Sequence, residues 1–393
     1  MALIVQKFGG SSVADAQRVS HVAGIIANTY RQGNQGVVVV SAQGKTTDHL
    51  IAQAQEVNPN PSKRELDALM ATGELASMAL MALALERLGM PAISLSGWQA
   101  GIHTDSTHGA ARVSRIDTER LRNELDKGNI VIVAGFQGVN KYEDITTLGR
   151  GGSDTSAVAL AAALNADLCQ IYTDVDGVYT ADPRIVPNAI KIDEITYDEM
   201  LELASLGANV LHNRSVEMAK KYNVNLEVLS SMTGAEGTIV KEVTDVEKLL
   251  IKGVTKDVNI ARISAMGVSD QPGIAFRLFS LLAKHKVSVD IILQSIGRNG
   301  TKDISFTVDK NKMDDAIALL QQNTEKWGAS NIVSDDNVTK VSIVGAGIMT
   351  TPGVAAKMFE ALADAGINIQ MISTSEIKIS VLIERKDADR AVA

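Results

Sequence analysis

The sequence lacks the features of secreted, membrane and nucleic-acid-binding proteins. Cys169 is its one cysteine, so a disulfide framework is excluded, and its apolar surroundings predict a small buried residue in a chain of the reducing cytoplasm. No apolar stretch reaches the roughly 20 residues that cross a bilayer, and no basic segment precedes the first apolar run as in a signal peptide. The net charge of −8 disfavours nucleic acid and anionic membrane surfaces as partners. What remains is a globular chain of 393 residues, long enough for two or three domains.

The first 240 residues alternate short apolar runs with helical patterns. Residues 12–31 and 65–89 have the helical patterns. Five runs that are mostly apolar throughout predict strands covered on both faces of a sheet: LIVQKF, GVVVVSA, PAISLSG, IVIVAGFQG and LCQIYTD. The sequence therefore predicts an open α/β sandwich with a mainly parallel sheet, in which ligands bind at the carboxyl ends of the strands.

An internal repeat follows a charged connecting segment. Residues 271–296 recur as residues 351–375 at an offset of 80. Each copy reads strand, Pro-Gly turn, amphipathic helix, strand, strand, so we expect two copies of one unit. Because the first copy continues into a further helical pattern, it predicts a ferredoxin-like βαββαβ domain.

The expected domain boundaries follow from this repeat. The first domain spans residues 1–245 and the repeat region 246–393, with copies at about 258–338 and 339–393. The second copy stops where its last helix would begin. Either the natural chain runs further or this copy is incomplete, and we favour the first interpretation.

A lysine and a glycine pair stand between the first predicted strand and helix, in Lys7-Phe8-Gly9-Gly10-Ser11. Two glycines let the backbone approach a ligand, and the N–H groups at a helix start attract an anion. The lysine precedes the glycines, so this is not a Walker A loop. A phosphate site and an ordinary turn with a solvated lysine both remain open on this segment alone.

A second glycine-rich loop holds Arg150, between Gly149 and Gly151, and continues into Gly152, Ser153 and Asp154. Arginine is suited to bidentate recognition of a carboxylate or phosphate. Asp154 at the start of the next helix serves either as an N-cap or as part of a site that positions a lysine or a metal.

Glu74 is the one charged residue between Ala68 and Leu85. A buried carboxylate must be paired, either with a group of the protein or with a cationic group of a ligand. Together with Arg150 for a carboxylate, Glu74 for an ammonium group describes an amino-acid site.

The segment YTDVDGVYTADPR follows the last of the five predicted strands. Its aspartates lack the ligand spacing of a calcium loop, and we predict no metal site within the protein. Its polar side chains suit a nucleotide pocket instead, and an ordinary surface turn is the alternative. The candidates are Thr173, Asp174, Tyr179, Asp182, Pro183 and Arg184.

These motifs together resemble the aspartokinases of the amino-acid kinase superfamily, with tandem ACT-type repeats. The resemblance covers nearly the whole chain, and KFGGSS followed by TTLGRGGSDTSA is its most specific part. It implies ATP-dependent phosphorylation of the side-chain carboxylate of L-aspartate, the entry step toward lysine, threonine and methionine, with Mg²⁺ bound mainly through the nucleotide.

The resemblance also assigns roles to residues. Lys7 would clamp the transferring phosphate and Asp154 would organise the catalytic centre. The expected substrate contacts are Ser41, Thr47, Glu74, Arg150, Gly151 and Ser153. The expected nucleotide contacts are Lys7, Phe8, Gly9, Gly10 and Ser11, with the six residues from Thr173 to Arg184 named above.

For the repeats, the resemblance implies ACT domains that bind lysine, threonine or both as feedback inhibitors and that join subunits. The assembly would be a homodimer, or an α2β2 complex with a separate regulatory chain. The expected effector contacts are Asp270, Pro272, Gly273, Ile274, Ala275, Gln294, Thr374 and Glu376.

One position departs from the family pattern, because Asn209 stands where relatives commonly have a lysine near the nucleotide. We expect weaker nucleotide binding or turnover from this change. Two other functions stay open: a kinase of glutamate or N-acetylglutamate, and an amino-acid sensor with a decayed kinase domain. Glu74 argues against N-acetylglutamate, because an acetylated amine carries no charge for it to bind. The presence of Lys7, Arg150 and Asp154 argues against a decayed kinase domain.

Overall fold

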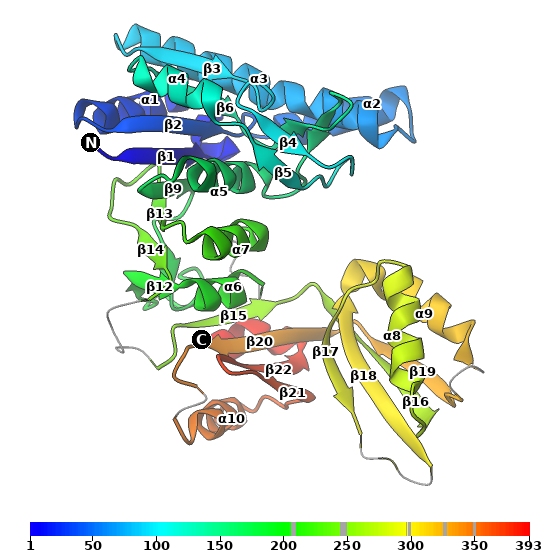
Figure 1. Ribbon diagram of the computed structural model, residues 1–393. Coiled ribbons are helices and arrows are strands. Elements are labelled where there is room, and N and C mark those ends of the chain that lie inside the picture. Colours follow the sequence, from blue (N-terminus) through cyan, green and yellow to red (C-terminus); the bar gives the residue numbers. More distant parts are fainter. Residues whose placement is uncertain (206–209, 244–249, 296, 298–299, 325–327, 349–350) are drawn as a thin grey trace. The chain divides into compact units, whose positions relative to one another are not determined.

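The computed structural model describes residues 1–205, 210–243, 250–295, 297, 300–324, 328–348 and 351–393 (Figure 1). These residues form two compact units. The first holds residues 1–180, 190–205 and 210–243, and the second holds 181–189 and 250–393. Asn209 lies outside the described residues.

An eight-stranded sheet is the centre of the first unit. Its order is β12-β14-β13-β9-β1-β2-β6-β3, and the neighbours from β13 to β3 are all parallel. β14 runs antiparallel to β13. The strands are β1 (Leu3–Phe8), β2 (Gln35–Val40), β3 (Ala92–Leu95), β6 (Ile130–Ala134), β9 (Leu168–Thr173), β12 (Glu194–Thr196), β13 (Leu226–Ser230) and β14 (Thr238–Lys241). All five apolar runs form strands of this sheet, and the predicted mainly parallel sheet is confirmed.

Helices pack on both faces of this sheet. Apolar side chains of α1 (Ala16–Arg31) and α3 (Lys63–Arg87) form one core with Phe8, Val40 and Tyr172. The Ala-rich α5 (Gly152–Leu164) is buried on nearly every side, between the sheet and α7 (Asn213–Tyr222). The other helices of the unit are the 3₁₀ turn η1 (Gly10–Val13), α2 (Thr46–Val57), α4 (Glu119–Asp126) and α6 (Tyr197–Ser205).

Two small sheets complete the first unit. One has the order β5-β4-β7-β8, and the other pairs β10 with β11. Their strands are β4 (Ile102–Thr104), β5 (Val113–Ile116), β7 (Gln137–Val139), β8 (Ile145–Thr147), β10 (Val178–Tyr179) and β11 (Lys191–Ile192). β8 leads directly into the loop that carries Arg150.

The first repeat in the second unit has the predicted βαββαβ plan. Its antiparallel sheet has the order β17-β18-β16-β19. The elements are β16 (Ile260–Ser269), α8 (Ile274–Lys284), β17 (Val289–Gln294), β18 (Thr301–Asp309), η2 (Lys310–Lys312), α9 (Met313–Gln321) and β19 (Asn331–Asp335).

The second repeat takes one strand from a distant part of the chain. Its sheet order is β15-β20-β22-β21, and β15 (Gly253–Asp257) comes from before the first repeat. The remaining elements are β20 (Val338–Val344), α10 (Val354–Asp364), β21 (Met371–Thr374), β22 (Lys378–Glu384), η4 (Arg385–Asp387) and α11 (Ala388–Val392). The sequence did not reveal this pairing, because β15 lies in the charged segment that we interpreted as a connection.

A short segment of the first expected domain also belongs to the second unit. Ala181, Ile185 and Val186 pack with Leu362 and Ile367 in one apolar cluster. The expected boundary at 245/246 therefore misses that residues 181–189 belong to the second unit, because their packing partners lie far along the sequence.

Candidate active site

The loops after β1, β2 and β6 are held together by backbone hydrogen bonds. The Ser41 N–H donates to the Phe8 carbonyl oxygen at 3.1 Å, and the Gly135 N–H donates to that of Val40 at 3.0 Å. The Gly9 N–H donates to the carbonyl oxygen of Tyr172, on β9, at 3.4 Å. The carboxyl ends of four parallel strands thus form one edge, where open α/β sheets bind their ligands.

Lys7 and Asp154 meet at this edge although 147 positions separate them in the sequence. Lys7 Nζ lies 2.7 Å from Asp154 Oδ1, and the two side chains are 11% and 13% exposed. Asp154 stands in the first turn of α5, so the ion pair lies beside a helix N-terminus. A nearly buried cation beside a helix N-terminus is suited to contact a phosphate.

The glycine pair brings two loops into close contact. A Cβ atom on Gly10 would lie 2.6 Å from the Ala42 carbonyl oxygen, and the Gly10 carbonyl oxygen accepts the Gly44 N–H at 3.0 Å. Only glycine fits this approach. Phe8 is fully buried and stacks on Tyr172, whereas Ser11 is exposed.

Glu74 is buried on α3, with 3% of its surface exposed. Its Oε1 accepts the Ala42 N–H at 3.1 Å, whereas its Oε2 is buried and has no hydrogen-bond partner among the described residues. Burial raises the pKa of this carboxyl group to about 7. Such a group is able to bind a cation that the protein itself does not supply.

The loop around Arg150 is supported from behind. Arg150 is exposed, and Arg214 on α7 donates from Nη1 to the Leu148 carbonyl oxygen at 2.9 Å. His212 packs against Gly151. The other expected substrate contacts are half-buried or buried: Ser41, Thr47 and Ser153.

The expected nucleotide residues are divided between the two units. Thr173, Asp174 and Tyr179 belong to the first unit, and the Thr173 hydroxyl donates to Asp174 Oδ1 at 3.2 Å. Asp182, Pro183 and Arg184 belong to the second. The structure joins Asp182 and Arg184 in an ion pair of 2.7 Å, so the six are not one cluster within a single unit.

The expected effector residues lie on the two ACT-like repeats. Gly273 and Gly353 each begin a helix in the left-handed region, with φ of 87° and 92°, so the repeats share one turn geometry. Asp270 forms an ion pair of 2.9 Å with Lys302. Ile274 is buried and Ala275 is half-buried, whereas four candidates are exposed: Pro272, Gln294, Thr374 and Glu376.

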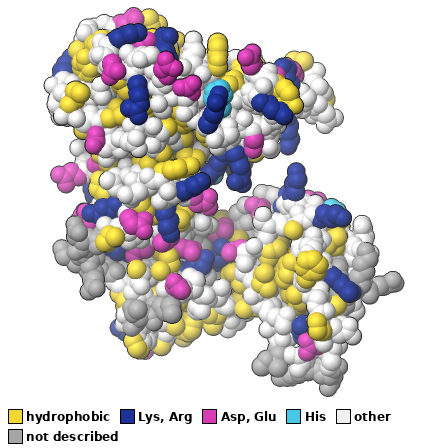
Figure 2. All heavy atoms as spheres, viewed as in Figure 1, with side chains coloured by type: hydrophobic (Ala, Val, Ile, Leu, Met, Phe, Trp, Pro, Cys, Tyr) yellow, Lys and Arg dark blue, Asp and Glu magenta, His cyan; other side chains and the backbone are white. Residues whose placement is uncertain are grey.

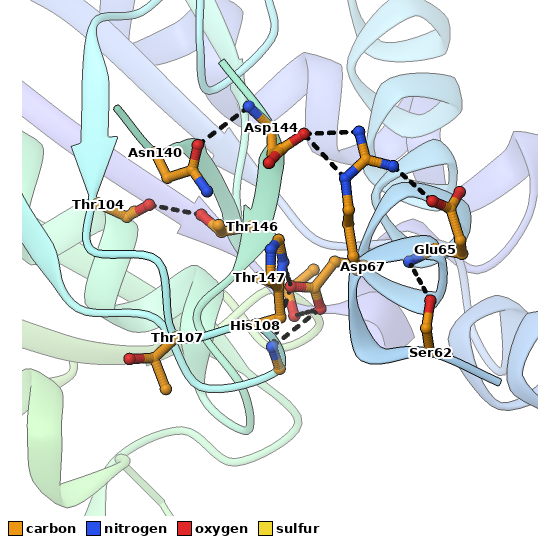
Figure 3. A network of polar contacts seen from close by, with 12 residues as sticks. Ser62, Glu65, Asp67, Thr104, Thr107, His108, Asn140, Asp144, Thr146 and Thr147 are labelled. Atoms are coloured by element: carbon orange, nitrogen blue, oxygen red, sulfur yellow. Dashed lines mark hydrogen bonds and ion pairs between the residues drawn. The ribbon is translucent and has the colours of Figure 1, made fainter. Parts of the chain in front are cut away.

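Sequence reasoning missed one buried group near these loops, namely Asp67 with His108, Gly109 and Thr147 (Figure 3). A signal was available, because Asp67 stands seven positions before Glu74 and both acids therefore lie on similar sides of α3. Among the described residues, no three His, Cys, Asp or Glu side chains are grouped closely enough to hold a metal ion.

Family models match both parts of the chain. The model described as the amino acid kinase family matches residues 2–230, and the ACT domain model matches residues 262–323 and 341–393. The fold is that of an amino acid kinase followed by ACT domains, as the sequence predicted.

Similar proteins narrow this class. An aspartokinase of Bacillus sp. (strain MGA3) is 49% identical over 393 residues, covering 100% of this chain and 96% of that protein. The E. coli aspartokinase III structure in complex with aspartate and ADP (R-state) is 26% identical, with a TM-score of 0.85, over 99% of this chain and 98% of that one. Its structure in complex with lysine and aspartate (T-state) is 27% identical, with a TM-score of 0.78 and the same coverage. The chain belongs to the aspartokinase family.

Proposed function

We propose that the protein transfers the γ-phosphoryl group of ATP to the side-chain carboxylate of L-aspartate and forms 4-phospho-L-aspartate. The observation that carries this proposal is the buried Oε2 of Glu74, which has no hydrogen-bond partner in the part of the chain that the structure describes. The α-ammonium group of a free amino acid supplies both the charge and the hydrogen bond that this oxygen lacks. An acetylated amine carries no charge, so the site favours aspartate over N-acetylated acids.

The other residues of the edge suit phosphoryl transfer. The reaction needs positioning and charge stabilisation, and the attacking carboxylate is already ionised at neutral pH, so no general base is required. Lys7 provides a positive charge that Asp154 holds in place at 2.7 Å. Arg150 is exposed and forms no ion pair with another described residue. It would bind the α-carboxylate, with Ser41, Thr47, Gly151 and Ser153 around the substrate.

ATP is the proposed phosphoryl donor, and the ADP and aspartate in the E. coli relative support this assignment. The loop from Phe8 to Ser11 would contact the phosphates, with Thr173, Asp174 and Tyr179 of the same unit around the nucleotide. Mg²⁺ would arrive on the nucleotide and neutralise phosphate charge. Asp154 supplies a carboxylate oxygen at this end of the site, a ligand type that Mg²⁺ accepts.

Feedback regulation is part of the proposal. The E. coli relative is described in complex with lysine in its T-state, which supports lysine, threonine or both as effectors here. The turn before α8 and the start of α8 would contribute Asp270, Pro272, Gly273, Ile274 and Ala275. Gln294 ends β17 of the first repeat, whereas Thr374 ends β21 of the second repeat and Glu376 lies in the turn after it. The reaction would then be the first step toward lysine, threonine and methionine.

An oligomer formed through the ACT repeats is also proposed. Phe276 on α8 is 75% exposed and Ile292 on β17 is 50% exposed. Figure 2 shows apolar side chains gathered over α8 and its neighbouring strands. Such a surface suits a second regulatory repeat, in a homodimer or with a separate regulatory chain.

We place the protein in the cytoplasm, away from membranes. One described helix, α3, is long and apolar enough to cross a bilayer by length and composition. Its buried residues include Asp67, Glu74 and Ser77, and it packs in the core of the first unit, so it is a core helix.

The test is an ADP-release assay with L-aspartate, L-glutamate and N-acetyl-L-glutamate, each with and without lysine and threonine at millimolar concentrations. We expect turnover with aspartate alone and inhibition by at least one effector. Lys7→Ala should abolish turnover while the thermal unfolding curve stays cooperative. ADP release that prefers another acceptor contradicts the proposed substrate, and activity that ignores both effectors contradicts the proposed regulation.

A further inference from the structure

A fully buried carboxylate, Asp67, lies outside the residues assigned to the proposed reaction. It stands on α3 and is 0% exposed. Its oxygens accept from the Thr147 hydroxyl at 2.5 Å, from the Gly109 N–H at 2.9 Å and from His108 Nδ1 at 3.0 Å (Figure 3). Because a carboxylate only accepts, His108 carries its proton on Nδ1. Every one of these donors comes from a segment other than α3.

These contacts attach the start of the Arg150 loop to α3. Thr147 is the last residue of β8, three positions before Arg150. The Thr147 carbonyl oxygen accepts the Ala111 N–H at 2.9 Å, and a Cβ atom on Gly149 would lie 3.1 Å from the Gly109 carbonyl oxygen. The segment from His108 to Ala111 is therefore packed between Asp67 and the loop.

The same helix carries Glu74. Seven residues are about two helical turns, so the two acids stand about 10 Å apart along the axis of α3 and on similar sides of it. Both are buried. One rigid element thus holds Glu74 directly and holds the Arg150 loop through Asp67.

We propose that Asp67 is a positioning residue that fixes Arg150 relative to Glu74, and so sets the selectivity of the site for a free α-amino acid. The inference rests on the proposed function, in which Glu74 binds the ammonium group and Arg150 binds the α-carboxylate. Asp67 does not touch the substrate. It acts through Thr147 and Gly109.

The experiment measures selectivity in the full-length protein. L-aspartate is compared with its α-amide, which lacks the charged α-carboxylate, and with succinate, which lacks the ammonium group. Their kcat/KM values are measured, or their inhibition constants where turnover is too slow. In Asp67→Asn we expect the preference for aspartate over the α-amide to fall about tenfold, because small displacements of a positioning group cost one to two orders of magnitude. The preference over succinate and the KM for ATP should stay within about twofold.

Three further variants separate positioning from general stability. Thr147→Val removes the hydroxyl group and should lower the preference for aspartate over the α-amide as Asp67→Asn does. Thr147→Ser keeps a hydroxyl group and should keep most of that preference. Glu124→Gln makes the same change of carboxylate to amide at another buried acid, on α4, which accepts hydrogen bonds from Lys127 and Asn129 after the helix. This variant should leave both preferences unchanged. If Asp67→Asn does not fold, the two Thr147 variants decide.

The possible failures are distinct. If the wild-type protein does not phosphorylate aspartate, the proposed function is wrong. If it does, but the variants keep the α-amide preference or lose both preferences equally, the positioning role of Asp67 is wrong and the proposed function stands.

Discussion

Glu74 combines burial with an unsatisfied oxygen, a combination that is unfavourable for stability. The pKa of the Glu74 carboxyl group is about 7 in the folded protein and near 4.5 in the unfolded chain. The folded state therefore binds more protons between these two pH values, and the stability contributed by this group falls as pH rises through that window. The α-ammonium group proposed to bind here would pair with this carboxylate and favour its ionised form.

Glu74→Gln should consequently stabilise the protein while inactivating it. Above pH 7 we expect the free energy of unfolding to rise by about 2–3 kcal/mol, with the gain vanishing as pH falls toward 4.5. The kcat/KM for aspartate should fall at least about a hundredfold, because an amide offers no charge to the ammonium group. Urea unfolding at several pH values and steady-state kinetics measure the two effects.

Glu124→Gln should change the free energy of unfolding in the opposite direction. The hydrogen bond from Lys127 lowers the pKa of Glu124, so loss of this carboxylate should destabilise the protein above its unfolded pKa and matter less in acid. A stability gain in Glu74→Gln that does not change with pH would show that its cause is not ionisation.

At the scale of secondary structure, the site depends on the close contact between the loop after β1 and the loop after β2. Gly10 lies against the Ala42 backbone, and the Ala42 N–H is the group that binds Glu74 Oε1. The phosphate end and the amino-acid end of the proposed site are thus connected through two peptide groups. The register of the strands, in which Phe8 pairs with Val40, sets this contact.

Gly10→Ala should lower activity more than stability. The added methyl group would lie 2.6 Å from the Ala42 carbonyl oxygen, so the loop after β2 must shift, at a cost of about 1–3 kcal/mol. We expect kcat/KM for aspartate to fall at least about tenfold. Gly24→Ala on α1 is the matched control, since none of the described residues outside the helix backbone lies within 4 Å of its added Cβ. This variant should be neutral or stabilising by up to about 1 kcal/mol. Equal kinetic losses in both variants would refute the role of this contact.

The sequence predicted individual strands and motifs better than it predicted the contacts between segments that are distant along the chain. The apolar runs revealed the parallel strands because burial on both faces leaves a continuous pattern. Lys7 and Asp154 were each found from a glycine-rich segment, but their contact depends on which strand lies beside α5. The contacts of Asp67 were not predicted, because its partners lie in other segments of the chain: His108, Gly109 and Thr147. β15 escaped because a short strand with Lys256 and Asp257 reads as a connection.

At the scale of the whole molecule, the two repeats offer a test of where regulation acts. Their helices begin at Gly273 and Gly353 with nearly the same left-handed backbone, and no atom of the described residues lies within 4 Å of an added Cβ at either position. An alanine therefore introduces similar backbone strain, of about 1 kcal/mol, in each repeat.

Gly273→Ala should weaken inhibition more than Gly353→Ala does. The turn before α8 holds most of the proposed effector contacts, and its N–H groups must keep their orientation to bind an amino acid. We expect the inhibitory concentration of lysine or threonine to rise at least about fivefold in Gly273→Ala and to change less than twofold in Gly353→Ala. Inhibition curves at fixed ATP and aspartate measure this, and equal shifts in the two variants would contradict a site at the first turn.

The pairing of β15 with β20 has a consequence for how the chain is made. About eighty residues, including the whole first repeat, must be synthesised between Asp257 and Val338 before β15 finds its partner. At roughly 5–20 residues per second, that delay is on the order of 4–16 seconds. During this interval the first repeat is free to fold, while β15 remains an open edge of the nascent chain. Lys256 and Asp257, the charges that concealed β15 as a strand, are the kind that keep such an edge from pairing with another chain.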